Sequence, residues 1–148
     1  MPAELPRRHP ATAAWGPGQD TSQKDVFSAQ APAAGAPAGP DGATTLRYVN
    51  PVTGGSVMHT MDCYMTRLTD GAATRPKRAT CNAVFFVTAD HGRTTVGGRT
   101  FEWSERDIFT VPHWEWASHE AIGGHADLFL ATDRIVYQRL GVLREEMR

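Results

Sequence analysis

The chain has 148 residues, of which 41% are hydrophobic, and its formal net charge is -1, from 15 basic and 16 acidic side chains. This length allows one domain around one core. The balanced charge, without a block of one sign, gives no support to binding of nucleic acid or an anionic membrane.

No run in the sequence reaches the ~18 apolar residues of a membrane helix, and no apolar segment follows the early arginine pair. We therefore expect a soluble protein without a secretory signal. The two cysteines, Cys63 and Cys81, are far apart and form no CxxC pair. A secreted disulfide framework normally has more cysteines, so a reducing, cytoplasmic location is expected for this chain.

The N-terminal part differs in composition from the rest. Of its first 45 residues, 23 are Ala, Pro or Gly, and seven of the ten prolines lie there. Such a segment buries too little apolar area to offset its ordering entropy. We predict a disordered tail over 1–45 and one globular domain over 46–148.

Short strand-like segments follow. In "VMHTMDCYMTRL" (57–68), Cys63 and Met65 alternate with Asp62 and Thr66, which is the period of a half-buried strand with its polar residues facing outwards. The continuous apolar run "NAVFFV" (82–87) predicts a strand that is covered on both faces.

The next segments complete an all-β pattern. "TTVGGRTFEW" (94–103) predicts a hairpin that turns at the Gly-Gly pair and has Phe101 and Trp103 on one face of its second strand. Three more strands are expected in "DIFTVP", "SHEAI" and "ADLFLAT". The last segment predicts a short helix that is capped by Thr132 or Asp133 and ends near Gly141. Many short strands at this spacing indicate an antiparallel barrel or jelly roll.

Five segments carry a family resemblance: "RYVNPVTGG", "RLTDGAATRPKRAT", "DIFTVPHWEWASHEA", "LFLATDR" and "LGVLREE". In this order, over about residues 46 to 146, they resemble the C-terminal cupin half of the gentisate 1,2-dioxygenase family, which includes salicylate and 1-hydroxy-2-naphthoate dioxygenases. The resemblance implies an antiparallel cupin barrel. It also implies that the family's Fe(II), which serves in O2-dependent ring cleavage, is held by three histidines of the N-terminal cupin, so no cofactor is expected in this chain.

A metal-binding cupin has a Gly, five residues and then His-x-His, because only side chains at i and i+2 of one strand point to the same side. Counting from Gly71 places these two positions at Lys77 and Ala79, and counting from Pro112 places the third at Ala117. An alanine has no donor atom, and a lysine must lose a proton first. We therefore predict that all three positions lack a metal ligand.

Three residues remain weak candidates for ligand binding. His119 lies two residues beyond Ala117 and so shares its inward face. An inward Lys77 could hold an anion such as an aromatic carboxylate. Because an unpaired buried ammonium is costly, however, we expect its charge to extend to the barrel mouth. Trp116 belongs to an aromatic group that could line a pocket or simply form core.

Three functions are compatible with these residues. The first is the metal-free cupin half of a gentisate-type dioxygenase, structural and inactive alone, which pairs with an iron-bearing cupin chain or with itself. The second is a stand-alone, non-catalytic cupin that binds a small anion or an aromatic carboxylate. The third is an iron enzyme with rearranged ligands, for which the histidine spacing predicts no convergence.

Overall fold

The computed structural model describes residues 37–148, and the part of the expected tail before residue 37 lies outside them. Within residues 37–148, ten strands form two five-stranded sheets. In spatial order the first sheet contains β1 (Thr44–Arg47), β2 (Asp62–Leu68), β9 (Ala126–Thr132), β4 (Ala83–Ala89) and β7 (Ile108–Val111). The second contains β10 (Glu145–Met147), β3 (Lys77–Ala79), β8 (Ala117–Ala121), β5 (His91–Val96) and β6 (Arg99–Ser104).

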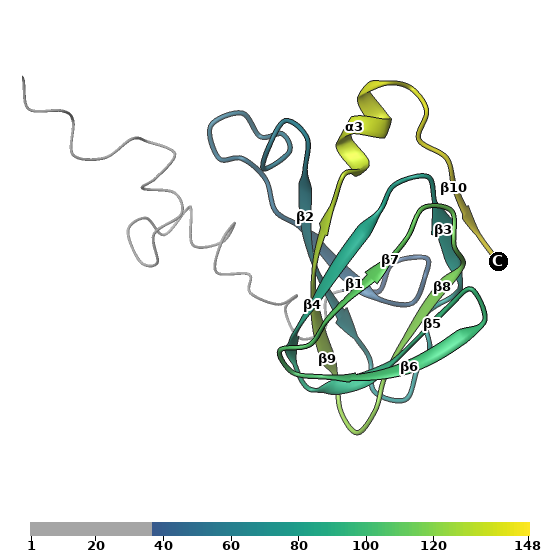
Figure 1. Ribbon diagram of the computed structural model, residues 1–148. Helices are drawn as coiled ribbons and strands as arrows, with labels where there is room; N and C mark the ends of the chain where they lie inside the picture. Colours follow the sequence, from purple (N-terminus) through teal and green to yellow (C-terminus); the bar gives the residue numbers. More distant parts are fainter. Residues whose placement is uncertain (1–36) are drawn as a thin grey trace, which may run out of the picture.

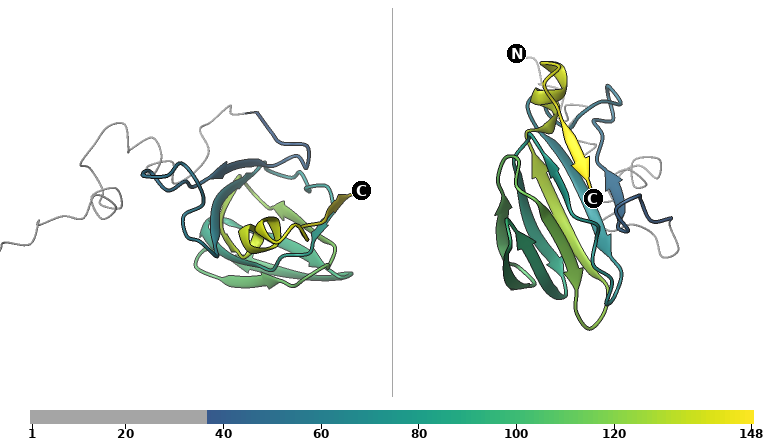
Figure 2. Two further views of the ribbon diagram at one scale, coloured as in Figure 1. Left: turned by 90° about the horizontal axis from the view of Figure 1, so that it is seen from above. Right: turned by 90° about the vertical axis from the view of Figure 1, so that its right-hand side faces the viewer.

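All pairs of these strands are antiparallel. The two sheets face each other, and the view from above in Figure 2 shows the strands arranged around a common interior (Figures 1 and 2). The expected all-β barrel is confirmed. The short helix α3 (Arg134–Arg139) lies at one end of the barrel, and β10 follows it along the edge of the second sheet (Figure 1).

The core lies between the inner faces of the sheets. Its buried members are Ala43, Leu68, Phe85, Val87, Trp103, Phe109, Ala121, Ala126 and Leu128. Ala43 and the nearby Asp41 are buried, and β1 begins at Thr44, so the boundary expected at residue 46 lies inside a strand. The packed fold therefore starts several residues earlier than the change in composition indicates.

The β5–β6 hairpin confirms the Gly-Gly signal. Val96 pairs with Arg99, and Gly97 and Gly98 between them have φ values of 55° and 82°. A two-residue turn with positive φ at both positions matches the right-handed twist of the strands, and glycine adopts it without a Cβ clash. Trp103 is buried and Phe101 packs against the core, as the shared face predicts.

The prediction of a strand covered on both faces is wrong for β4. Phe85 and Val87 are buried, whereas Val84 is 44% and Phe86 37% exposed on the outer face of the first sheet. Ile108 of the neighbouring β7, the register partner of Phe86, is 67% exposed. The inner side chains pack in the core, and nothing in the described chain covers the outer side chains of this strand pair.

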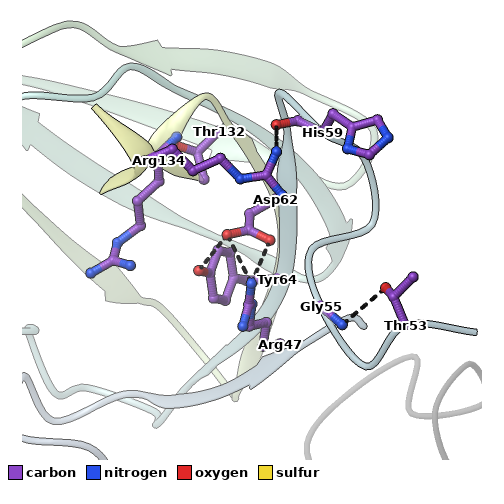
Figure 3. Close-up of polar contacts among 9 residues, drawn as sticks. Arg47, Thr53, Gly55, His59, Asp62, Tyr64, Thr132 and Arg134 are labelled. Atoms are coloured by element: carbon purple, nitrogen blue, oxygen red, sulfur yellow. Dashed lines mark hydrogen bonds and ion pairs between the residues drawn. The ribbon is translucent and has the colours of Figure 1, made fainter. Parts of the chain in front are cut away.

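The polar face predicted for the strand at 57–68 is also wrong in part. The strand begins only at Asp62, and this residue is fully buried. Its carboxylate accepts hydrogen bonds from Arg47 at 3.0 Å and from the hydroxyl of Tyr64 at 3.3 Å (Figure 3). A buried carboxylate is tolerated where such partners replace its water.

The C-terminal helix begins as predicted near Thr132 and Asp133. The hydroxyl of Thr132 accepts a hydrogen bond from the backbone N–H of Arg134, while the carboxylate of Asp133 binds Asn82 instead of the helix. Gly141, with φ of 70°, follows the helix end.

No helix in the described part of the chain is long and apolar enough to cross a bilayer.

Candidate functional site

A cavity of about 650 Å³ opens between the two sheets of the barrel. Strands of both sheets contribute to it, and so does the segment before β1. The exposed residues of this segment and of the edge strand β10 form its mouth. Its lining residues include Asp41, Tyr64, Lys77, Arg78, Ala79, Cys81, Ala83, Phe85, Val111, Ala117, His119, Leu130, Arg134, Glu145 and Glu146. Its volume falls in the range typical of small-molecule sites, about 300–1,000 Å³.

The three positions counted from the sequence come together in this cavity. Lys77 and Ala79 are two residues apart on β3, and Ala117 is the cross-strand partner of Lys77 on β8. All three line the cavity. Their spacing therefore places three side chains around one space, although none of the three is an imidazole.

The described residues do not fit the family's iron. No group of three His, Cys, Asp or Glu side chains within residues 37–148 is arranged to hold a metal ion. His119 lines the cavity as its spacing from Ala117 predicts, but His113 binds the carbonyl of Thr80 and His91 lies beside Asp90 at the surface. The histidines are thus distributed over separate places.

Lys77 forms an ion pair that the sequence did not predict. Its Nζ atom lies 2.7 Å from Oδ2 of Asp41, and the two side chains are 50% and 10% exposed. Burial tends to raise the pKa of Asp41, but the hydrogen bond and positive charge of Lys77, with the backbone N–H of Ala43, lower it overall. The Lys77 ammonium therefore extends to the mouth of the cavity, where it already has an anionic partner.

Two further ion pairs surround the mouth. Arg78 donates to Glu146 with Nε–Oε2 at 2.9 Å, and Arg134 donates to Glu145 with Nε–Oε1 at 3.2 Å. Both glutamates belong to β10, which pairs with β3. The sequence assigned no function to Glu145 or Glu146, because no strand was expected after the helix end near Gly141.

Trp116, the third candidate, is not among the residues that line the cavity in the described chain. The guanidinium carbon of Arg78 lies 4.6 Å from the centre of its ring, and that of Arg148 lies 4.4 Å away. Arg78 also lies 4.3 Å from the ring of Trp114. Arg78 on β3 and Arg148, which follows β10, therefore both pack on the aromatic turn that precedes β8. Trp103, Phe101 and Phe109 pack in the core instead.

His119 is the candidate with the most constrained environment. Its side chain is buried, and Nδ1 lies 2.9 Å from Oγ1 of Thr94, which is fully buried. Burial lowers the pKa of His119 to about 3, and the charge of Lys77 adds to this effect while Asp41 opposes it. The imidazole is therefore neutral at physiological pH.

Both cysteines are free thiols, Cys63 on the first sheet and Cys81 beside the cavity. Burial raises the pKa of each thiol, and nearby carboxylates contribute in the same direction. Neither is a reactive thiolate, since the thiolate form is disfavoured at neutral pH.

The chain is similar in sequence to several dioxygenases. The chain is 36% identical over 118 residues to a 5-aminosalicylate 1,2-dioxygenase of Comamonas sp., covering 78% of this chain and 31% of that protein. It is 36% identical over 100 residues to gentisate 1,2 dioxygenase 1 of Aquipseudomonas alcaligenes, covering 68% of this chain and 28% of that protein. The chain thus spans less than a third of the length of these relatives. No protein-family model matches it.

Solved structures of dioxygenases are also similar to this chain. A salicylate 1,2-dioxygenase from Pseudaminobacter salicylatoxidans superposes with a TM-score of 0.71 at 34% identity, over 76% of this chain and 32% of that one. The same enzyme with gentisate gives a TM-score of 0.70 at 33% identity, over 86% of this chain and 34% of that one. A cupin 2 domain-containing protein from Halorhodospira halophila, with a TM-score of 0.56, 16% identity and coverage of 67% and 69%, shares the fold.

Proposed function

Since the chain belongs to the gentisate 1,2-dioxygenase family and corresponds to the C-terminal cupin half of its members, we propose that it is a metal-free, structural cupin of a ring-cleaving dioxygenase. The complete enzyme would insert both atoms of O2 into the ring of a hydroxylated benzoate, with Fe(II) in a separate cupin. This chain alone would be inactive.

One observation carries the proposal. The three places where a metal-binding cupin has histidines are occupied by Lys77, Ala79 and Ala117, and these side chains surround one cavity. Alanine cannot ligate a metal, and the Lys77 ammonium is paired with Asp41. In this proposal the barrel keeps the geometry of a metal cupin, and the side chains at these three positions supply no metal ligand.

The outer face of the first sheet supports a role in assembly. Phe86 and Ile108 are adjacent across β4 and β7, and both are exposed together with Val84. Exposed apolar side chains on neighbouring strands favour contact with another protein surface. In this proposal the face contacts an iron-bearing cupin or a second copy of the chain, in the cytoplasm, where Cys63 and Cys81 would remain reduced.

The test is metal analysis together with a gentisate ring-opening assay on the purified chain. We expect no stoichiometric iron and no turnover by the chain alone after incubation with Fe(II) under anaerobic conditions and exposure to O2. Stoichiometric iron with turnover would overturn the proposal and support an enzyme with rearranged ligands. Adding a three-histidine cupin encoded next to this chain should restore ring cleavage if the two form one enzyme.

The cavity favours a second candidate function, a stand-alone cupin that binds a small ligand. The cavity of about 650 Å³ is large enough for a single aromatic ring. An anionic ligand such as an aromatic carboxylate would have to compete with Asp41 for Lys77. Titration of the chain with benzoate, with Lys77→Ala as the comparison, tests this version: binding that is absent, or unchanged in the variant, contradicts it.

A further inference from the structure

A directed chain of hydrogen bonds ends at the barrel cavity. Nε1 of Trp103 donates to Oγ1 of Thr94 at 2.8 Å, and the same Oγ1 lies 2.9 Å from Nδ1 of His119. Indole N–H is a donor only, whereas a hydroxyl has one hydrogen to donate. Thr94 has no other side-chain hydrogen bond among the described residues, so its hydrogen goes to Nδ1 of His119.

This direction determines the tautomer of His119. Nδ1 accepts the hydrogen of Thr94, so a neutral imidazole carries its own hydrogen on Nε2. Trp103, Thr94 and His119, which form this series of hydrogen bonds, are all buried, and His119 is 5% exposed. Trp103 and Thr94 therefore hold the ring in one orientation and leave Nε2–H as a fixed donor.

The Nε2–H group faces the cavity and has no hydrogen-bond partner within residues 37–148. No fully buried polar side-chain atom of the described chain lacks a partner. The unpaired Nε2 atom is consequently open to the cavity that His119 lines. A donor of this kind needs an acceptor, because an unpaired polar group in an apolar site costs free energy.

Apolar and aromatic side chains form part of the cavity wall beside this donor. The ring of Phe85 lies 4.8 Å from the His119 ring, centre to centre, and the two rings are tilted by 50°. Ala83, Val111 and Leu130 line the same cavity. This combination of apolar surface with an oriented donor and a few other polar side chains, such as Tyr64 and Thr66, is typical of small-molecule sites.

The charges at the cavity disfavour an anion. Lys77, Arg78 and Arg134 line it, but each is paired with a carboxylate: Asp41, Glu146 and Glu145, respectively. The donor on His119 is itself neutral. A carboxylate that reached it would lose its water without gaining an unpaired cation, which is unfavourable.

We propose that the barrel cavity binds a neutral, single-ring aromatic compound whose carbonyl oxygen accepts the hydrogen bond of His119 Nε2–H. This inference deepens the second candidate function by naming the class of ligand and the residue that orients it. It is compatible with the structural role proposed first, because a cupin half that completes an enzyme can also hold a ligand in its own barrel.

Acetophenone, ethylbenzene and benzoate are suitable probes, since they share a ring and differ in their acceptor and charge. Affinities would be measured by NMR titration of chain carrying ¹⁵N-labelled histidine, at neutral pH. We expect acetophenone to bind at least about tenfold more tightly than ethylbenzene, the size of effect that one unsatisfied donor produces. The Nε2 resonance of His119 should shift on addition of acetophenone, and benzoate should bind more weakly than acetophenone.

Two variants test the role of the imidazole. His119→Phe removes the donor with a similar shape and should abolish the preference for acetophenone. His119→Gln keeps an N–H donor and should retain part of it, and the exposed His125→Gln should bind like the parent. If His119→Phe does not fold, the relative affinity of the parent chain for acetophenone and ethylbenzene still tests the inference.

The inference would be overturned by equal affinity for acetophenone and ethylbenzene, by the absence of saturable binding of acetophenone, or by a preference that persists in His119→Phe. Tighter binding of benzoate would also overturn it, while supporting the anion-binding form of the second candidate function. None of these results bears on the structural role, which the iron and ring-opening measurements test separately.

Discussion

Lys77 and Ala117 lie directly opposite each other across the β3–β8 pair, and both line the barrel cavity. The Cα positions of cross-strand partners are about 4.5–5.5 Å apart, so two side chains placed there can reach one ion. Ala79, two residues along β3, points to the same cavity.

The first prediction follows from this arrangement. The triple variant Lys77→His, Ala79→His, Ala117→His should bind one Ni²⁺ per chain, because three neutral imidazoles then surround one space. Isothermal titration calorimetry and metal analysis after dialysis measure this. The parent and the single variant Lys77→His are the controls and should retain no metal. A triple variant that folds but binds no metal would show that the three positions do not converge.

The second prediction concerns pH and His119. Its pKa is about 3 in the folded chain and about 6.5 when unfolded, so the unfolded chain binds more protons between these values. The associated stability is complete above pH 6.5 and is lost as pH falls towards 3. The free energy of unfolding should therefore decrease by about 2 kcal/mol between pH 7 and pH 5 through this residue alone.

Urea titrations at several pH values measure this effect. His119→Gln should show a correspondingly flatter pH dependence, because glutamine does not titrate. The exposed His125→Gln should retain the slope of the parent. An unchanged slope in His119→Gln would mean that the imidazole titrates normally in the folded chain.

The third prediction concerns the ion pair of Lys77 with Asp41. Lys77→Met should destabilise the fold more than Asp41→Asn, because the carboxylate is buried and the ammonium is half-exposed. A double-mutant cycle in urea should give a coupling of about 1 kcal/mol. The more exposed Arg93–Glu120 pair is a matched control and should give less.

This pair also has its own pH dependence. The pKa of Asp41 is lower in the folded chain than in the unfolded one, so its stabilisation is complete above the unfolded pKa and is lost as pH falls through the folded value. A coupling that stays constant down to strongly acidic pH would contradict the pairing.

The fourth prediction concerns Gly92 on β5. A Cβ atom at this position would lie 2.2 Å from the carbonyl oxygen of Glu120 and 2.5 Å from the ring of Trp103. Gly92→Ala should therefore force a shift of backbone or indole and cost about 2 kcal/mol in the free energy of unfolding. Gly55→Ala is the control: its Cβ would meet only the hydroxyl of Thr53 at 3.4 Å. Equal stability of the two variants would contradict the close packing.

The fifth prediction concerns association through the outer face of the first sheet. Sedimentation velocity over a range of concentrations should show the parent chain associating, and Ile108→Lys should shift it towards the monomer, because a charge then has to be buried at the contact. Leu140→Lys changes another exposed apolar residue outside this sheet and should behave like the parent. Association that persists unchanged in Ile108→Lys would assign the contact to another surface.

Much of the fold could be predicted from local patterns. The Gly97–Gly98 hairpin depends on two consecutive positive φ values, and the strand over Ala126–Thr132 coincides with its apolar segment. The side-chain alternation of strands also placed Ala79 and His119 on the inward face. These features depend on neighbours in sequence, so the sequence carries them directly.

Other features could not be predicted in this way. The exposure of Val84 and Phe86 depends on which face of the sheet is covered, and an apolar run reads the same in either case. The alternation pattern predicts an outward-facing Asp62, whereas its burial depends on Arg47 and Tyr64, which donate hydrogen bonds to its carboxylate. Asp41 lies at the end of a segment whose composition indicates a tail, although it binds Lys77 36 residues away.

By itself the sequence indicated an antiparallel barrel through its strand period and, through its resemblance, the gentisate dioxygenase family. Counting from Gly71 and Pro112 gave Lys77, Ala79 and Ala117 as the expected histidine positions. Strand period and motif spacing are local properties, so the sequence carries them. Only the tertiary structure decided that Lys77 is paired with Asp41 and that Thr94 and Trp103 orient His119 towards the cavity. Both depend on side chains that meet across the barrel, and spacing along the chain does not specify such partners.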